Sequence, residues 1–413
     1  MTAMPLSQLT DPWSVPLEAI DIAQPDWFVA DTQWDWFRRL RDESPVHIFD
    51  HPEFGRYWSI TRYEDIMYVD THHEIFSSEP SITLRDQPED FTLPMFIAMD
   101  EPRHSKTRAE VNPVVGSRNL PNFAELIRSR TREVLDSLPL DETFNWVDLV
   151  SIELTTRMLA TLFDFPYEER RRLTRWSDVA TALPGGDFIE TEEQRREELL
   201  ECLQTFTELW NEKAQQPPRH DMISMLAHGD ATRDMQPLEF LGNLLLLIVG
   251  GNDTTRNSMS GSVLALHQFP QELEKLKANP KLIPSLVSET IRWQTPLAFM
   301  RRTALQDVEM HGQRIRQGDK VAMWYASGNR DERVFEQPDD FIIDRPNVRK
   351  HVSFGYGIHR CMGSHLAELQ LRILWEEMLE RFERVEVVGE PRRAHSVFVR
   401  GYTSLPVRLH PAV

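Results

Sequence analysis

The feature that most restricts how this chain can fold is one long, apolar helical stretch near its middle. It extends from about Leu238 to His267, with Pro237 suited to its first turn and Pro270 beyond its end. At ~1.5 Å per residue such a helix is about 45 Å long, which is enough to cross the whole molecule. Its longest apolar run, LLLLIV (244–249), is far short of the roughly 20 residues that span a bilayer. We therefore expect a soluble protein built around one buried helix.

The centre of this helix reads VGGNDTT (249–255), a weak helical sequence within an apolar segment. Each glycine inside a helix costs roughly 1 kcal/mol relative to alanine, and a threonine can bond back to the i−4 carbonyl and bend the helix. Taken alone, Gly250 and Gly251 fit close helix packing as well as they fit a site. Asp253 and Thr254 favour a site, because an acid beside a hydroxyl is costly to bury unless the pair handles protons or water.

A second restrictive feature is SFGYGIHRCMG (353–363), which contains Cys361. Apolar residues recur at helical spacing after it, so the thiol should lie at a helix N-terminus, where the dipole and free N–H groups favour thiolate. Glycines at positions 355, 357 and 363 would let the backbone turn tightly and approach a flat partner.

Three roles for Cys361 remain open at this point: a buried structural thiol, a nucleophile, or a metal ligand. A zinc site lacks further ligands at short spacing, since Cys202 lies far off in a charged helical stretch. A nucleophile assisted by His359 or His365 lacks an evident oxyanion motif and an Asn or Asp partner.

Two other motifs are less specific. Glu289 and Arg292 in SETIRW (288–293) are spaced i,i+3 and can pair, although such a lone pair is usually a surface salt bridge worth under ~1 kcal/mol. His104 and Arg108 in DEPRHSKTR (100–108) would project from one helix face and bind an anion. They make a poor metal site because arginine stays protonated, and a solvated helix start is equally compatible.

The remaining sequence predicts a mainly α fold with a minor β portion. Helical patterns dominate from 119 to 230, with breaks near 183–188 and 215–221, and a breaker-rich loop covers 86–104. The first ~30 residues are rich in Pro and Trp and should be extended chain. No repeat or linker is evident, so we predict a single domain over 1–413. Strand patterns occur at 55–70, where a short helix follows them, at 300–346 and at 396–410.

Charge and cysteine content exclude several classes of protein. A net charge of −19 argues against a broad nucleic-acid-binding surface, which needs a basic face. Two cysteines do not form a disulfide framework, so a reducing cytoplasm is the expected location. The N-terminus has neither a basic region nor a continuous apolar stretch, and we expect no signal peptide or membrane anchor.

Together these segments resemble the cytochrome P-450 superfamily, the haem-thiolate monooxygenases. FGYGIHRCMG (354–363) matches the haem-binding signature FGxGxHxCxG at every fixed position, and GGNDTT (250–255) fits the oxygen-activating motif (A/G)Gx(D/E)T(T/S). ETIR (289–292) is the ExxR motif. DEPRHSKTR resembles the helix that contacts a haem propionate, and NRDERVFEQPDDFIIDR (329–345) resembles the segment leading to the haem loop. The motifs occur in the family's order and cover most of the chain.

The resemblance implies a single cytochrome P-450 domain with haem b between the long helix and the Cys-containing loop. Cys361 would be the axial thiolate, whose electron donation favours O–O cleavage. Thr254 would hydrogen-bond dioxygen during its activation, and Asp253 would help to feed it protons from solvent. Other implied haem contacts are His104, Arg108, Arg302 and His359 at the propionates, Phe354 and Gly355 near the thiolate, and Gly250 and Gly251, which would leave room for oxygen.

The resemblance also implies a brace for the haem loop and a redox partner. Glu289 and Arg292 would brace the loop from the proximal side, with His351 preferred over Arg345 as their third member. Electrons would come from a ferredoxin served by an NAD(P)H-dependent flavin reductase. Because ferredoxins are acidic, we expect a local basic patch near Cys361, although each of its candidates equally fits a role in balancing surface acids. The candidates are Arg360, Arg349, Lys350, Lys106 and Arg103.

The finer sequence suggests a substrate. VGGNDTTRNSMSG (249–261) and ETIRWQTPLAFMRRTA (289–304) are similar to the bacterial branch that hydroxylates medium-chain alkanes and fatty acids at the terminal carbon. Such an enzyme inserts one oxygen atom of O2 into an unactivated C–H bond and must hold the chain end-on by shape. The residues expected to line its pocket are Leu244, Ile248, Leu297, Ala298, Phe299, Met300, Val397 and Phe398.

Three alternatives to this function remain. An apolar lining would serve a terpene or a steroid almost as well as a linear chain. A peroxide-driven hydroxylase is disfavoured because such enzymes tend to lose the pair that Asp253 and Thr254 form here. A haem sensor without turnover would need neither that pair nor a basic docking face.

Overall fold

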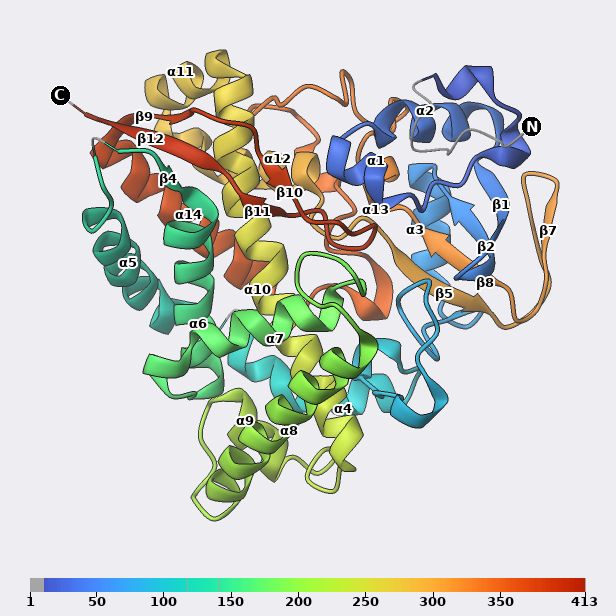
Figure 1. Ribbon diagram of the computed structural model, residues 1–413, viewed down its shortest axis with the longest axis horizontal. Coiled ribbons are helices and arrows are strands. Elements are labelled where there is room, and N and C mark those ends of the chain that lie inside the picture. Colours follow the sequence, from blue (N-terminus) through green and yellow to red (C-terminus); the bar gives the residue numbers. More distant parts are fainter. Residues whose placement is uncertain (1–10, 117, 141, 413) are drawn as a thin grey trace.

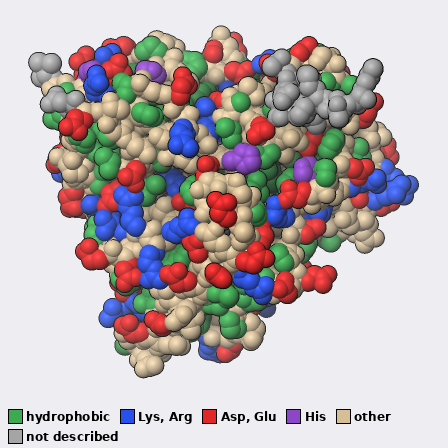
Figure 2. All heavy atoms as spheres, viewed as in Figure 1, with side chains coloured by type: hydrophobic (Ala, Val, Ile, Leu, Met, Phe, Trp, Pro, Cys, Tyr) green, Lys and Arg blue, Asp and Glu red, His purple; other side chains and the backbone are tan. Residues whose placement is uncertain are grey.

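The computed structural model describes residues 11–116, 118–140 and 142–412. Helices form most of it, and the main β-sheet lies to one side of the longest helix (Figure 1). This arrangement confirms the predicted mainly α class with a minor β portion. On the face shown in Figure 2, acidic and basic side chains are intermixed, so the net charge of −19 does not gather into one acidic patch there.

The long helix α10 (Pro237–Gln268) runs through the middle of the molecule (Figure 1) and agrees with the predicted helix to within one residue at each end. Pro237 occupies its first turn, as expected. Pro270 does not lead into a loop, since it begins the next helix, α11 (Pro270–Ala278). Helices that pack on α10 include α6 (Glu153–Phe163), α7 (Arg171–Thr181), α8 (Glu192–Ala214), α12 (Ile283–Gln294) and α14 (Ser364–Arg381).

Both breaks predicted within the helical region 119–230 are confirmed, because they fall between α7 and α8 and between α8 and α9. The prediction of extended chain at the N-terminus is wrong where the structure describes this segment. Short 3-10 turns and α1 occur there, and the Trp27 ring stacks on Trp36 at 4.1 Å. Burial of large aromatic rings folds this segment back onto the domain. The remaining helices are α1 (Pro25–Ala30), α2 (Gln33–Glu43), α3 (Tyr63–Thr71), α4 (Arg103–Val115), α5 (Leu120–Asp136), α9 (Met222–His228) and α13 (Tyr325–Gly328).

The main sheet joins both ends of the sequence. Its strand order is β1–β2–β8–β5–β3, in which β2 and β8 are parallel and the other neighbours are antiparallel. Strands from the first fifth of the chain therefore pair with strands beyond residue 300, so the chain forms one domain. The strands are β1 (Val46–His51), β2 (Gly55–Ile60), β3 (Phe76–Ser77), β5 (Met300–Ala304) and β8 (Lys320–Met323).

Smaller sheets account for the other predicted strands. A three-stranded sheet has the order β4–β12–β9, and two hairpin-like pairs complete the β portion. These strands are β4 (Phe144–Asn145), β6 (Val308–Met310), β7 (Gln313–Ile315), β9 (Phe382–Val387), β10 (Arg392–Arg393), β11 (Tyr402–Ser404) and β12 (Pro406–Pro411). In the part of the chain that the structure describes, no helix is long and apolar enough to cross a membrane.

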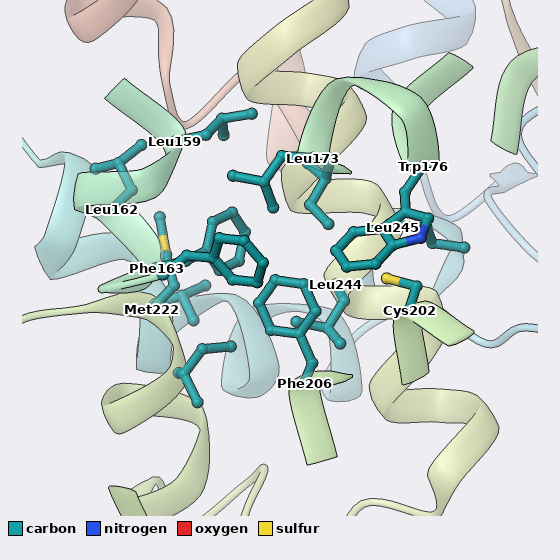
Figure 3. Close-up of a cluster of buried hydrophobic side chains, with 14 of the residues drawn as sticks. Leu159, Leu162, Phe163, Leu173, Trp176, Cys202, Phe206, Met222, Leu244 and Leu245 are labelled. Carbon is teal, nitrogen blue, oxygen red and sulfur yellow. The ribbon is translucent and has the colours of Figure 1, made fainter. Parts of the chain in front are cut away.

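The largest apolar core lies where α6, α7, α8 and α9 meet α10 (Figure 3). Phe163 and Phe206 face each other at its centre with ring centroids 5.5 Å apart. Cys202 is buried in this core, and burial raises the pKa of its thiol. Cys202 is therefore a structural thiol, whereas the second cysteine lies at a cavity.

Candidate active site

A cavity of about 920 Å³ lies between the middle of α10 and the loop that precedes α14. Gly250 and Thr254 line it from α10, and Phe354 and Cys361 line it from the loop. The two segments that the sequence singled out thus form opposite walls of one site. A volume of this size suits a cofactor or a large ligand.

The Cys361 loop is held by its own backbone. The Cys361 N–H donates to the Phe354 carbonyl oxygen at 2.8 Å, and α14 begins three residues later, as predicted. Gly355 has φ +63°, and a Cβ there would lie 3.2 Å from Oδ2 of Asp70 and 3.3 Å from the Tyr325 hydroxyl. Glycine is required at this turn by both the left-handed backbone and the close approach of these side chains.

The charge state of Cys361 depends on two opposing effects. Burial raises the pKa of the Cys361 thiol, while the N–H groups of Gly363 and Ser364 and the guanidinium groups of Arg108 and Arg360 lower it. The net shift is upward, so the helix terminus alone does not produce a thiolate, although the side chain is exposed to the cavity. A metal ion bound at the sulfur would deprotonate the thiol outright.

His104 and Arg108 fasten α4 to the Cys361 loop at one end of the cavity. The two ring nitrogens of His104 lie 2.7 Å from the Phe96 carbonyl oxygen and 3.1 Å from that of Ile358. Arg108 donates to the carbonyl oxygens of Ile358 at 3.4 Å and Arg360 at 2.6 Å. Both residues line the cavity, so the predicted anion-binding pair is brought to the site.

The ring of His359 lies against that of His104, with centroids 4.0 Å apart and the ring planes tilted by 51°. Its Nε2 lies 2.8 Å from the Ser78 hydroxyl, while its buried Nδ1 has no hydrogen-bond partner. Burial, together with Arg302, His104 and Arg108, lowers the pKa of His359 to about 2, so the ring is neutral. A buried unpartnered nitrogen among cations forms an environment that favours an anion.

Arg302 lines the cavity from β5 and is held by an acid that the sequence did not single out. Its Nη2 donates to Asp70 Oδ1 at 2.8 Å, and both groups are buried. Asp70 also accepts the Tyr325 hydroxyl at 2.9 Å and the Tyr356 N–H at 2.7 Å. The sequence signal that could have identified Asp70 is its position as a single acid on the apolar face of the helix over 63–71. All three partners lie in the last third of the chain, beyond the reach of local patterns.

The two glycines of α10 have different functions. A Cβ at Gly250 would meet no atom within 4 Å, because this position faces the cavity. A Cβ at Gly251 would lie 2.7 Å from Cδ2 of Leu159 on α6. Gly251 borders the cavity, but its missing side chain serves helix packing, and the expectation that it makes room for oxygen is wrong.

Thr254 and Asp253 point in different directions. The Thr254 hydroxyl lines the cavity and donates to the Gly250 carbonyl oxygen at 2.9 Å, the predicted back bond. Asp253 is fully buried against α7, where it accepts the Ser177 hydroxyl at 2.8 Å and pairs with Arg256 at 3.0 Å. It does not line the cavity, because successive helical residues are rotated by about 100°. Its predicted role of feeding protons from solvent does not require it to do so.

Glu289 and Arg292 form a buried pair rather than a surface salt bridge. Nε and Nη2 of Arg292 each lie 2.8 Å from a Glu289 carboxylate oxygen, and both side chains are fully buried. The third member is Arg345, whose Nε lies 3.3 Å from both oxygens. The preference for His351 is wrong. Its ring packs on Phe354 at 5.3 Å, and burial and nearby arginines lower the pKa of His351 to about 3, so it has no charge to offer Glu289.

Comparison with known proteins agrees with this geometry. The family model described as cytochrome P450 matches residues 183–399. The chain is 34% identical to linalool 8-monooxygenase of Pseudomonas putida, over 96% of this chain and 100% of that protein. The chain belongs to the cytochrome P450 family.

Two further comparisons extend the family assignment. The methyl-branched lipid omega-hydroxylase of Mycobacterium bovis is 30% identical, over 96% of each chain. The solved structure of cytochrome P450-153 from Novosphingobium aromaticivorans superimposes with a TM-score of 0.88 at 46% identity, covering 97% of this chain and 100% of that one. The protein is a cytochrome P450 monooxygenase, and its cofactor is haem b.

The residues of this P450 fit that cofactor. Cys361 presents a sulfur to the cavity, and Gly250 leaves the opposite wall free of a side chain. Haem propionates are anionic, and the unpartnered nitrogen of His359 lies among the cations that would receive them. The residues that would hold haem are Cys361, His104, Arg108, Arg302 and His359.

The predicted substrate pocket of this P450 needs correction. Leu297, Met300 and Phe398 line the cavity, as expected. Leu244 and Ile248 instead pack in the core around Phe206, on another face of α10. The lining face contains Leu247, which lies seven residues before Thr254 and therefore shares its stripe. Three more predicted lining residues pack instead in the core around Trp324, and these are Ala298, Phe299 and Val397.

The expected basic patch is largely exposed. Lys106, Arg349, Lys350 and Arg360 are exposed, and Arg360 directly precedes Cys361. Arg103 is exposed as well but pairs with Glu239 at 2.8 Å, so it serves to balance an acid.

Proposed function

We propose that this P450 hydroxylates medium-chain alkanes or fatty acids at the terminal carbon. The observation that carries the proposal is the lining of the cavity near Thr254, where Leu246, Leu247 and Val249 present aliphatic side chains. An apolar chain end is favoured there because no hydrogen-bonding group is left unsatisfied when it displaces water. The similarity to a protein named as a lipid omega-hydroxylase supports the same reading.

The cavity also has a charged outer part. Its lining includes Glu53 in the turn between β1 and β2, Arg85 in the loop after β3, and Glu192 at the start of α8. Arg85 pairs with Glu53 and, at 3.1 Å, with Glu192. A long substrate with its apolar end near Thr254 would therefore extend toward polar residues, which favours end-on binding.

When bound, haem supplies the activation of O2, so that each turnover consumes two electrons and two protons, places one oxygen atom in the product and releases the other as water. The chain's own residues position the substrate and deliver protons. Thr254 presents a hydroxyl at the cavity wall beside Gly250, where no side chain blocks the approach of a small molecule. The aliphatic lining excludes bulk water, which strengthens each polar contact inside.

We propose further that an acidic ferredoxin delivers the electrons at the exposed cations Lys106, Arg349, Lys350 and Arg360. Opposite charges steer such an encounter and make its rate depend on salt. Raising the salt concentration should therefore slow reduction by the ferredoxin more than it slows binding of a neutral substrate.

The role of Thr254 is tested by Thr254→Ala in the holoenzyme. The variant should consume NAD(P)H through the redox partners while forming at least about 10-fold less product, because loss of a general acid costs roughly 10²-fold or more. Thr254→Ser keeps the hydroxyl and serves as the control. Unchanged coupling between NAD(P)H use and product in Thr254→Ala would contradict the assignment.

The substrate class is tested by titrating the ferric haem with alkanes, fatty acids, terpenes and steroids of matched size and following its spin state. A response to linear chains supports terminal hydroxylation. The second candidate is a terpene, because the curated relative at 34% identity is named linalool 8-monooxygenase. A response confined to terpenes would favour that candidate, and a response confined to steroids would contradict both.

A further inference from the structure

A second, small cavity of about 30 Å³ lies beside the main one, between α7, α10 and the segment before β11. Asp178 and Thr181 line it from α7, and Arg256 lines it from α10. A space of this size with such polar groups in its wall holds one or two water molecules. Thr181 also lines the main cavity, so its side chain stands between the two spaces.

Behind this wall lies a buried network with two acids and one cation. Arg256 pairs with Asp178 and, at 3.0 Å, with Asp253. The Thr181 hydroxyl lies 3.4 Å from Oδ2 of Asp253, and the Ser177 hydroxyl donates to Oδ1 at 2.8 Å. A surplus negative charge in a buried site is costly, so one of the two acids is disposed to hold a proton.

We propose that the small cavity and Asp178 form the outer end of a proton path that enters the main cavity at Thr181, with Asp253 as the inner carboxylate. Arg256 cannot release a proton, and it therefore holds both carboxylates in place. A proton moves from Asp178 to water in the small cavity. The Thr181 hydroxyl, which lies against Asp253 Oδ2, accepts that proton and releases its own into the main cavity, where turnover consumes it. Water in the small cavity then returns a proton from solvent to Asp178. These steps transfer protons only and involve no oxidation or reduction. The proposal rests on the proposed function, because turnover is what consumes the protons.

The electrostatics of Asp178 suit a proton donor. Burial and the neighbouring Asp253 raise the pKa of Asp178, and Arg256 and Arg175 oppose them, with a result of about 6. The other ionisable side chains that line the small cavity are those of Asp187, His395 and Tyr402. A carboxyl group with a pKa near neutral pH holds a proton in part of the molecules and can also release it.

Two variants of the holoenzyme test the path. Asp178→Asn removes the acid, and Thr181→Val removes the hydroxyl at nearly constant size. Each should lower the fraction of NAD(P)H converted to product about 10-fold, less than the roughly 10²-fold of a lost general acid, because water can bridge part of the gap. Each should also increase the effect of D2O on product formation. Asp178→Glu should restore both properties.

Thr174→Val is the matched control for Thr181→Val. Thr174 lies on the same helix and is buried, and its hydroxyl has no hydrogen-bond partner and lines neither cavity. Its removal should leave coupling and the D2O effect unchanged. A change as large as that in Thr181→Val would mean that packing of α7, and not the hydroxyl, is responsible, and would overturn the proposal.

A measurement on the resting holoenzyme is independent of turnover. Infrared difference spectra between pH 5 and 7 should contain a carboxyl C=O band that is missing in Asp178→Asn. Absence of that difference would overturn the proposal. Wild-type coupling in Asp178→Asn and Thr181→Val would overturn it too, and would leave the proposed function standing if Thr254→Ala still uncouples. If Thr254→Ala also remains coupled, the proposed function itself fails.

Discussion

Two buried clusters of acid and arginine side chains, one centred on α12 and the other between α7 and α10, have opposite compositions. The brace cluster contains one acid and two arginines, Glu289, Arg292 and Arg345. The relay cluster contains two acids and one arginine, Asp178, Asp253 and Arg256. The ratio of charges decides their behaviour. A surplus of arginine cannot titrate, whereas a surplus of carboxylate can be relieved by binding a proton.

The surplus positive charge in the brace cluster is stabilised by hydrogen bonds from arginine to backbone carbonyl oxygens. Arg292 donates to the carbonyl oxygens of Asn329 at 2.7 Å, Pro338 at 2.8 Å and Asp340 at 3.0 Å. Glu289 in turn accepts the Ile342 N–H at 2.8 Å. These bonds hold the segment that leads to the Cys361 loop, so the cluster works as a fixed support.

The relay cluster has fewer such bonds. Nε of Arg256 is buried and has no hydrogen-bond partner, and a space for water lies next to the cluster. Because one of its polar groups has no hydrogen-bond partner, the relay cluster can exchange protons and rearrange slightly. Three measurements test this contrast, and the first should produce the greatest change.

The largest effect is expected for Glu289→Gln. The change leaves Arg292 and Arg345 as unpaired buried cations and should lower the free energy of unfolding by about 3–5 kcal/mol, as for other broken buried pairs. Urea unfolding measures it. Glu274→Gln on α11 is the control, because Glu274 is exposed and its pair with Lys277 is worth under ~1 kcal/mol. Equal losses in the two variants would contradict the role of the brace cluster.

A smaller effect that depends on pH is expected for Asp178→Asn. The folded pKa of Asp178 is raised to about 6 from 3.8, so the folded state binds its proton more tightly than the unfolded state. Stability from this group is present below about pH 4 and is lost as the pH rises to about 6, by about 1–3 kcal/mol.

The unfolding free energy of the wild type should therefore decrease over this interval more steeply than that of Asp178→Asn. Asp187→Asn, which removes an exposed acid beside the same small cavity, should keep the wild-type slope. Identical slopes in the wild type and Asp178→Asn would show that Asp178 does not titrate as described.

The smallest effect is expected for His351→Leu. Nδ1 of His351 is buried without a partner, and the lowered pKa of about 3 keeps the ring neutral, so its removal should change stability by less than about 1 kcal/mol. Arg345→Met should cost more, because it removes a charge that faces Glu289. The reverse order would restore His351 as the third member of the brace cluster.

Local patterns predicted much of this molecule. Pro237 and the apolar run after it placed α10 to within a residue, and the glycines around Cys361 identified the loop that carries the thiol. The sequence also indicated which face of α10 lines the cavity, because Leu247 lies seven residues before Thr254 and therefore on the same face. Leu244 and Ile248 were predicted from hydrophobicity alone, and they lie on another face.

Other parts of the site depended on residues far apart in the chain. Asp70 and Ser78 lie in the first fifth of the sequence, yet they hold Arg302 and His359 from its last third. No spacing rule connects such pairs, because sheet order and helix packing bring them together. Tertiary packing likewise decides that Arg345, and not His351, contacts Glu289. Both residues lie more than 50 positions after Glu289, where local helix geometry has no influence.

By itself the sequence determined the family, the long helix and the loop that carries Cys361. Helical periodicity, backbone freedom at glycine and a thiol before a helix act over a few residues, and they leave a readable pattern. Only the tertiary structure decided which charges meet, and with them which acids hold protons. Electrostatic energies depend on distance and burial in space, so Asp178 acquired its raised pKa from its burial against α10, although two other helices separate α7 from α10 in the sequence.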